Sequence, residues 1–197
     1  MHLGEVIMVD STPVGVAFPG HRAPAVGFEA PFEMLSACHE RVERMLDLLS
    51  KLRKHLAQNG WDAQAASAAE DVMRYFDLAA PQHHLDEEIH VFPAVLALNN
   101  GRLDLLVYRL KQEHLEMEKL WVGVRSALDS VVHADAQSWT GFSDAMNVDM
   151  ELFFAVYKDH INDEEIYVYP AAAKVLNPEQ LEGMSHDMVR RRSHSST

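Results

Sequence analysis

Two segments of the 197-residue chain repeat the same arrangement of a histidine and a carboxylate. In the first segment Glu87 follows His83 by four residues, and in the second Glu164 follows His160 at the same spacing. Each pair is followed by a similar segment, EIHVFP or EIYVYP, that ends in an aromatic residue and a proline. Residues four apart lie on one face of a helix about one turn from each other, so an imidazole and a carboxylate at this spacing can bind one metal ion together.

A second parallel links the regions that precede these two segments. His39 and Glu43 have the same spacing as His114 and Glu118. Because His39 precedes the first repeated histidine by 44 residues and His114 precedes the second by 46, the chain reads as a duplicated helical hairpin. In antiparallel neighbouring helices of this length, all four histidines fall in one layer of a bundle.

Six residues are therefore the candidate metal ligands: His39, His83, Glu87, His114, His160 and Glu164. Buried carboxylates without partners are unfavourable by several kcal/mol, and a metal centre removes that cost for both at once. Six ligands exceed the need of one tetrahedral zinc. Two irons, each with two histidines and sharing both glutamates, would use all six and leave positions for an exogenous ligand, with zinc or manganese as possible substitutes.

Composition excludes several classes of protein. A formal net charge of −13, from 17 basic and 30 acidic residues, argues against a nucleic-acid binder. The single cysteine, Cys38, excludes a disulfide framework and any multi-cysteine metal site. The N-terminus lacks the features of a secretory signal, and no apolar run approaches the roughly 18 residues that a membrane span needs. We expect a cytoplasmic protein without membrane contact.

Hydrophobic periodicity predicts an all-α, up-down-up-down four-helix bundle. The first predicted helix follows Pro31 and ends at Asn59-Gly60, and the other three cover about Asp62 to Leu98, Arg102 to Val132 and Gln137 to Val175. Residues 1–28, with three prolines and four glycines, predict an extended N-terminal arm before a bundle domain of residues 29–177. We expect a partly disordered tail at 178–197, and kinks near Pro81 and Pro93.

The sequence resembles the hemerythrin-like, His-His-Glu cation-binding domains over residues 30–177. The resemblance is carried by His39 and by the segments HHLDEEIHVFP (83–93), EHLEMEKL (113–120) and DHINDEEIYVYP (159–170). It implies a non-heme di-iron centre, oxo- or hydroxo-bridged, with the four histidines as terminal ligands and the two glutamates as bridges. It also implies a protein that binds dioxygen, senses oxygen or redox state, or handles nitric oxide.

The chain departs from the oxygen-carrying members in two respects. Those members have a fifth histidine on the third helix and an aspartate five residues after the last histidine, whereas this chain has Glu118 after His114 and offers Glu164 on the fourth helix. The pattern is closer to that of bacterial iron-centre repair proteins, but we expect no counterpart of their cysteine-bearing N-terminal domain.

Several functional alternatives stay open at this stage. The leading hypothesis is a di-iron protein that binds or senses oxygen, nitric oxide or redox state. The alternatives are a redox enzyme that reduces peroxide or nitric oxide, and a protein for iron storage or delivery in iron-centre repair. Enzymatic turnover ranks lower because no acid–base pair beyond the ligands is evident, and a homodimer is possible.

The roles of the residues around the ligands stay open as well. His84, which stands four residues before Glu88, is the rival of His83 as a ligand. Additional ligands or carboxylates that orient a ligand histidine could come from Glu43, Glu88, Glu118 or Glu165, and each could equally lie solvated on a helix face. Tyr157 either donates to a ligand bound at the metals or packs in the core.

Overall fold

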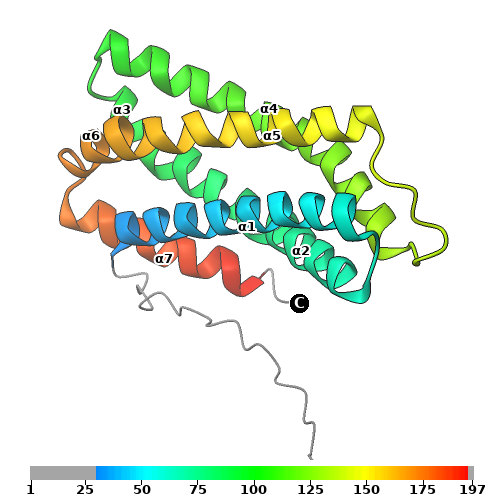
Figure 1. Ribbon diagram of the computed structural model, residues 1–197. Coiled ribbons are helices and arrows are strands. Elements are labelled where there is room, and N and C mark those ends of the chain that lie inside the picture. Colours follow the sequence, from blue (N-terminus) through cyan, green and yellow to red (C-terminus); the bar gives the residue numbers. More distant parts are fainter. Residues whose placement is uncertain (1–29, 195–197) are drawn as a thin grey trace, which may run out of the picture.

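The structure is a computed structural model that describes residues 30–194, and within this range the chain forms helices and turns without strands. The elements are α1 (Pro31–Asn59), α2 (Ala63–Asp86), η1 (Glu87–Val91), α3 (Phe92–Leu96), α4 (Gly101–Val132), α5 (Asp144–Asp163), η2 (Glu164–Val168), α6 (Tyr169–Ala173) and α7 (Pro178–His194). Because α2, η1 and α3 are continuous, as are α5, η2 and α6, they form two long helices that run antiparallel to α1 and α4 (Figure 1). The predicted up-down-up-down four-helix bundle is confirmed, and the predicted N-terminal arm lies outside the described residues.

Local sequence signals set the ends of the long helices. Pro31 stands in the first turn of α1, where a missing N–H costs nothing, and the helix ends at Gly60, whose φ of 78° is easily reached only without a side chain. The α2 helix starts at Asp62, whose carboxylate accepts a hydrogen bond from the Ala65 N–H at 2.7 Å. Asn100 caps α4 in the same way.

The fourth long helix begins at Asp144 and not near Gln137. The Asp135 carboxylate accepts hydrogen bonds from the backbone N–H groups of residues 137 and 138, which closes a turn in place of a helix. The Ser143 hydroxyl then accepts from the Met146 N–H and starts α5. The turn at Asp135 and the cap at Ser143 thus outweigh the helical periodicity of this stretch.

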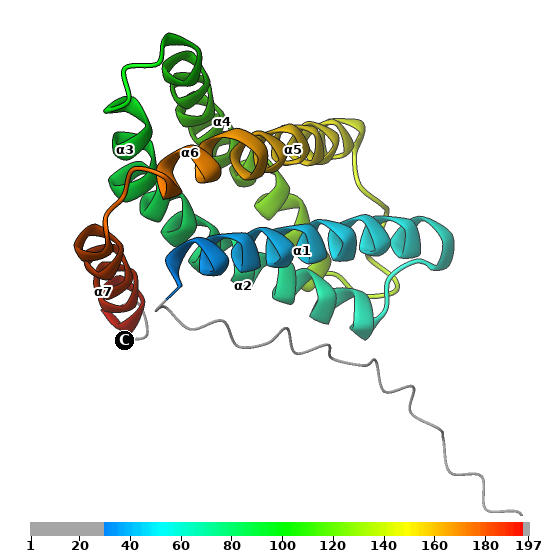
Figure 2. The ribbon, with the colours of Figure 1, turned by 90° about the vertical axis from the view of Figure 1, so that its left-hand side faces the viewer.

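The expected disorder of the C-terminal tail is wrong for residues 178–194, which form α7. This helix packs against α1 and α2, and it lies across the end of the bundle where α1 begins (Figure 2). Met184 and Met188, one turn apart on α7, are buried in an apolar cluster with Leu35 and Phe92. Burial of this apolar face stabilises α7. The polar composition of the tail gave no sign of that face.

Ion pairs also fasten α7 to the second long helix. Asp86 is fully buried, and its two carboxylate oxygens contact Arg191 and Arg192, with 2.6 Å between Oδ2 and Nη2 of Arg192. His90 pairs with Asp187 at 2.9 Å. Two basic residues of the predicted tail, Arg191 and Arg192, therefore form ion pairs within the fold.

A polar layer separates two apolar clusters inside the bundle. One cluster includes Val42 and Met117, and the other includes Leu35 and Leu110. On α1 the residue between the two clusters is His39, and the other long helices follow the same pattern with a histidine at the boundary. The histidines are thus held between two close-packed apolar layers.

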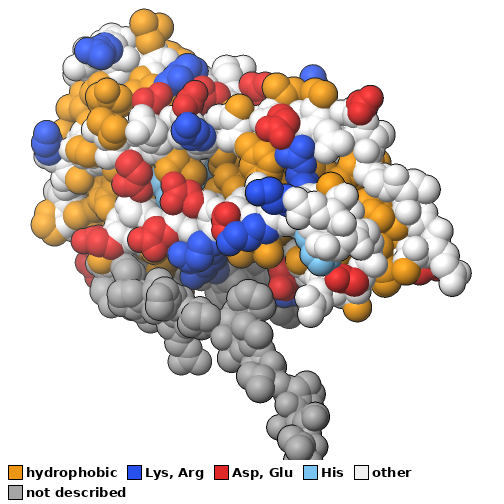
Figure 3. All heavy atoms as spheres, in the orientation of Figure 1, with side chains coloured by type: hydrophobic (Ala, Val, Ile, Leu, Met, Phe, Trp, Pro, Cys, Tyr) orange, Lys and Arg blue, Asp and Glu red, His pale blue; other side chains and the backbone are white. Residues whose placement is uncertain are grey.

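The surface itself shows little of this layer. On the face drawn in Figure 3, acidic, basic and apolar side chains are interspersed, and few histidine side chains are visible. Among the described residues, no helix combines the length and the apolar character that crossing a membrane requires.

Candidate metal centre

The six candidate ligands come together in two overlapping groups. Position A, as we name it, consists of His39, His83, Glu87 and Glu164, and position B consists of His114, His160 and the same two glutamates. In each group, one potential ligand atom from every residue lies within 4.8 Å of the others. All six side chains are buried, and both glutamates are fully inaccessible. The structure therefore places two potential metal positions side by side that share two carboxylates.

The glutamates are delivered by widened helical turns. Glu87 and Glu164 begin the π-helical segments η1 and η2, in which the N–H groups of Phe92 and Tyr169 donate five residues back, to the glutamate carbonyls. The prolines that follow lack an N–H, and their rings would collide with the carbonyl four residues earlier in an ordinary helix. The widened turn relieves this collision, so the proline of each repeat accounts for the backbone at its glutamate.

Each glutamate spans the two positions. Glu164 directs Oε2 toward Nε2 of His39, at 3.1 Å, and Oε1 toward Nε2 of His160, also at 3.1 Å. Glu87 directs Oε1 toward Nε2 of His83, at 3.3 Å, and Oε2 toward the corresponding nitrogen of the histidine on α4, at 3.5 Å. The two oxygens of each glutamate therefore face imidazoles of different positions, as bridging carboxylates would.

Three of the four oxygens of the two glutamates have no hydrogen bonds that would compensate their burial. Oε2 of Glu87 and both carboxylate oxygens of Glu164 are buried and make no hydrogen bond. Burying such groups without a partner costs several kcal/mol. A cation between the oxygens and the imidazole nitrogens would supply the missing interaction, so the donor set fits a metal centre.

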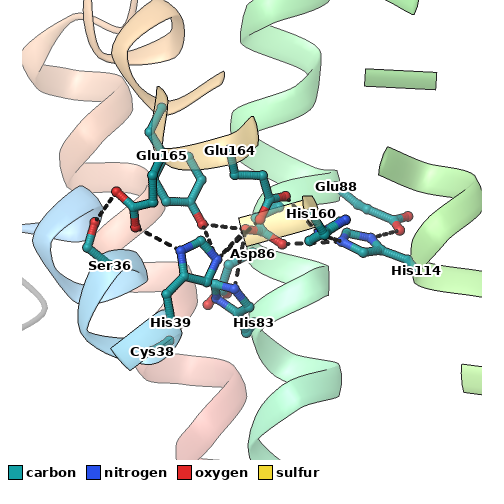
Figure 4. A network of polar contacts seen from close by, with 12 residues as sticks. Ser36, Cys38, His39, His83, Asp86, Glu88, His114, His160, Glu164 and Glu165 are labelled. Atoms are coloured by element: carbon teal, nitrogen blue, oxygen red, sulfur yellow. Dashed lines mark hydrogen bonds and ion pairs between the residues drawn. The ribbon is translucent and has the colours of Figure 1, made fainter. Parts of the chain in front are cut away.

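Carboxylates outside the centre hold three of the four imidazoles through Nδ1. The contacts are Glu165 with His39 at 2.7 Å, Glu88 with His114 at 2.8 Å, and Glu113 with His160 at 3.0 Å. Figure 4 shows Glu165 and Glu88 on opposite flanks, each pointing at its histidine. Because a carboxylate only accepts, Nδ1 must carry the proton and donate, which leaves the Nε2 lone pair for a metal.

Only part of this outer shell was expected from the sequence. Glu88 and Glu165 contact His114 and His39, so of the two roles left open for them the structure supports the orientation of a histidine. Glu113 was missed, and the one signal for it is its place directly before His114. Glu43 and Glu118 are exposed and belong to neither potential metal position, so the solvated alternative holds for both.

Burial lowers the pKa values of the histidines of the site, and the neighbouring carboxylates raise them, so the net shifts differ in direction. Burial alone would lower the pKa of His39, but the neighbouring carboxylates of Glu164 and Glu165 outweigh it and raise the pKa to about 9. The same opposition, with the Glu164 charge as the largest favourable contribution, raises the pKa of His160 to about 10. For His83 burial prevails and lowers the pKa to about 4. Without a metal, protons on His39 and His160 thus balance part of the carboxylate charge.

Tyr169 adds a hydroxyl that sequence reasoning missed. Its oxygen lies 3.2 Å from Nε2 of His39, and its O–H donates to Oε1 of Glu87. Burial, and then the charge of Glu87, raises the pKa of Tyr169 well above its usual value, so the phenol stays protonated. The aromatic position of the repeated motif was visible in the sequence, but its inward direction depends on the widened turn before it.

His84 and Tyr157 are buried next to the centre and outside both positions. The His84 ring stacks on that of His114 with 4.0 Å between centroids, which places it beside position B. Both residues line a small cavity of about 40 Å³, together with Phe76, Ala80, Pro81, Met117, Glu118, Trp121 and Phe153. The geometry therefore favours His83 over His84 as the potential ligand on α2.

Comparison with known proteins agrees with this geometry. The family described as the hemerythrin HHE cation binding domain matches residues 30–172. An uncharacterised protein of Haemophilus influenzae is 28% identical over 162 residues, which cover 82% of this chain and 90% of that protein.

Proposed function

The chain belongs to the hemerythrin HHE cation binding domain family, and on this premise we propose that it holds a dinuclear non-heme iron centre that binds or senses oxygen or nitric oxide. One ion would be held at position A and the other at position B. The observation that carries the proposal is the pair of buried glutamates, each with one oxygen toward each position.

Iron matches the donor set because imidazole and bridging carboxylate together suit a borderline metal. The chain offers each ion two imidazoles and two carboxylate oxygens, which leaves coordination positions for an exogenous ligand. When bound, the pair of irons would supply reversible redox chemistry and a binding position for a diatomic molecule. The protein's part is to orient the imidazoles, keep the site dry and hold the Tyr169 proton next to it.

The cavity beside position B supports a small exogenous ligand. Its volume of about 40 Å³ has room for a water-sized or diatomic molecule. Pockets for organic ligands are larger, on the order of 300–1,000 Å³. Its walls carry two groups capable of hydrogen bonds near the centre, the His84 imidazole and the Tyr157 hydroxyl.

Metal analysis with optical spectroscopy tests the proposal. Protein produced with iron available should contain close to two irons per chain, and the spectra of anaerobic protein should change on exposure to air or nitric oxide. Protein that takes up no iron under these conditions, or whose spectra respond to neither gas, would refute it.

A double variant, His83→Ala with His160→Ala, tests the ligand assignment because it removes one imidazole from each position. We expect iron content to fall to background. His133→Ala is the matched control. His133 follows the last residue of α4, and its side chain is 73% exposed. Circular dichroism of both variants separates loss of metal from loss of fold.

A second candidate is a redox enzyme that reduces peroxide or nitric oxide. The observation that favours it is the protonated Tyr169 hydroxyl beside His39 and Glu87, since such reductions consume protons. Sustained consumption of substrate with a physiological reductant, at a rate that Tyr169→Phe lowers, would indicate the enzyme. Binding without consumption would indicate the carrier or sensor.

A further inference from the structure

The four imidazoles of the centre are not equally supported. Nδ1 of His39, His114 and His160 each contacts an outer carboxylate at 2.7 to 3.0 Å. Only 2% of His83 is exposed, and its buried Nδ1 has no hydrogen-bond partner. Position B thus has two supported imidazoles, whereas position A has one.

The duplicated hairpin explains where this difference arises. The repeat places His39 in correspondence with His114 and His83 in correspondence with His160. In the second half, the carboxylate that supports the α5 histidine comes from Glu113, the residue directly before the α4 histidine. In the first half, the corresponding residue is Cys38, on α1 beside His39 (Figure 4). A thiol is a weak acceptor and does not replace a carboxylate.

The aromatic residues of the two repeats differ in the same direction. Phe92 lies against His114 of position B, with 5.6 Å between ring centroids, and offers no hydroxyl. Its counterpart Tyr169 lies next to position A and donates a hydrogen bond to Oε1 of Glu87, the oxygen that faces His83. A carboxylate oxygen that already accepts a hydrogen bond is a weaker donor to a metal ion.

We propose that the two metal positions are inequivalent: position B binds its ion first and most tightly, and position A binds last and releases first. This inference rests on the proposed function, because it assumes that both positions bind metal. A carboxylate on Nδ1 fixes the ring and makes Nε2 a stronger ligand, and removing such a partner typically costs about 10- to 100-fold in metal affinity. The single-ion protein therefore holds its ion at His114 and His160, and mixed-metal centres can be prepared by adding two metals in sequence.

Cobalt(II) is a suitable probe for locating the first ion. Metal-free, full-length protein is crystallised with one equivalent of Co²⁺, and anomalous diffraction locates the ion. We expect density between His114 and His160, and density mainly between His39 and His83 would overturn the inference. The location decides, because two identical positions would also fill in two apparent steps when the ions repel each other.

Matched substitutions test the cause of the inequivalence. Competition titration of Co²⁺ against a chromophoric chelator gives a stronger and a weaker affinity. Cys38→Glu supplies position A with the carboxylate that position B has, and we expect it to raise the weaker affinity by about 10- to 100-fold while the stronger one stays constant. Glu113→Cys makes the reverse exchange and should lower the stronger affinity by a similar factor. Glu116→Cys, which removes an exposed carboxylate of α4, is the control and should change neither affinity.

The outcomes separate the inference from the proposed function. If the wild-type protein binds no Co²⁺, the dinuclear centre itself is refuted. If it binds two ions but the first is spread equally over both positions, the centre stands and the inequivalence is refuted. Should Cys38→Glu fail to fold, as judged by circular dichroism, the Glu113→Cys titration alone decides, and an unchanged stronger affinity would overturn the inference.

Discussion

Replacing Asp86 with asparagine should destabilise the protein through the C-terminal helix. The carboxylate is fully buried and contacts both Arg191 and Arg192, and the asparagine side chain would remove its charge without changing its size. Removing one partner of a buried ion pair typically costs about 3–5 kcal/mol.

The lower end of that range applies here for two reasons. The side chains of Arg191 and Arg192 keep 17% and 25% of their exposure, so water screens part of their charge. Arg191 also retains Asp187 as a partner. We therefore expect a loss of about 3 kcal/mol. For a domain of this size, about 2–4 °C per kcal/mol converts this loss into a fall in Tm of roughly 6–12 °C.

Thermal unfolding of metal-free protein, followed by circular dichroism, measures this loss. Asp71→Asn is the matched control, because Asp71 pairs with Arg74 on the surface, where the two side chains are 52% and 65% exposed. Exposed pairs contribute at most about 1 kcal/mol, so the control should lower Tm by no more than about 4 °C. Equal, small shifts for the two variants would show that α7 does not depend on the buried carboxylate and would refute the reasoning.

Three further predictions concern the centre. Iron at a hundredfold its Kd should stabilise the protein by about 2.7 kcal/mol, so chelation should lower Tm by roughly 5–11 °C, and a Tm indifferent to chelator would argue against specific binding. In metal-free protein, the raised pKa values of His39 (about 9) and His160 (about 10) contribute stability that is fully present below their ordinary pKa of 6.5 and is lost as the pH rises through 9 to 10. Urea unfolding at a series of pH values measures this contribution, and a flat profile between pH 7 and 10 would contradict it. Glu88→Ala should weaken metal binding about 10- to 100-fold in a chelator competition because His114 loses its acceptor, and an affinity equal to that of the wild type would show that the contact has no effect on binding.

The prediction of the helices and of their core faces succeeded because both depend on local patterns. Leu35, Val42 and Leu49, spaced along one face of the first helix, are all buried as the periodicity predicts. Where local patterns conflicted, the sequence misled. The Asp135 and Ser143 caps moved the start of α5, and the polar composition of residues 178–194 concealed two methionines one turn apart that pack into the core.

The sequence by itself determined which residues share the polar layer, because spacing along four helices and internal repetition are properties of the chain alone. The tertiary structure decided what surrounds that layer. Glu165 reaches His39 across 126 residues of sequence, and Tyr169 reaches Glu87 across 82. Such contacts depend on the rotation and packing of whole helices about one another, which no local pattern records. For the same reason the missing partner of His83, and with it the difference between the two halves of the centre, became visible only in the folded molecule.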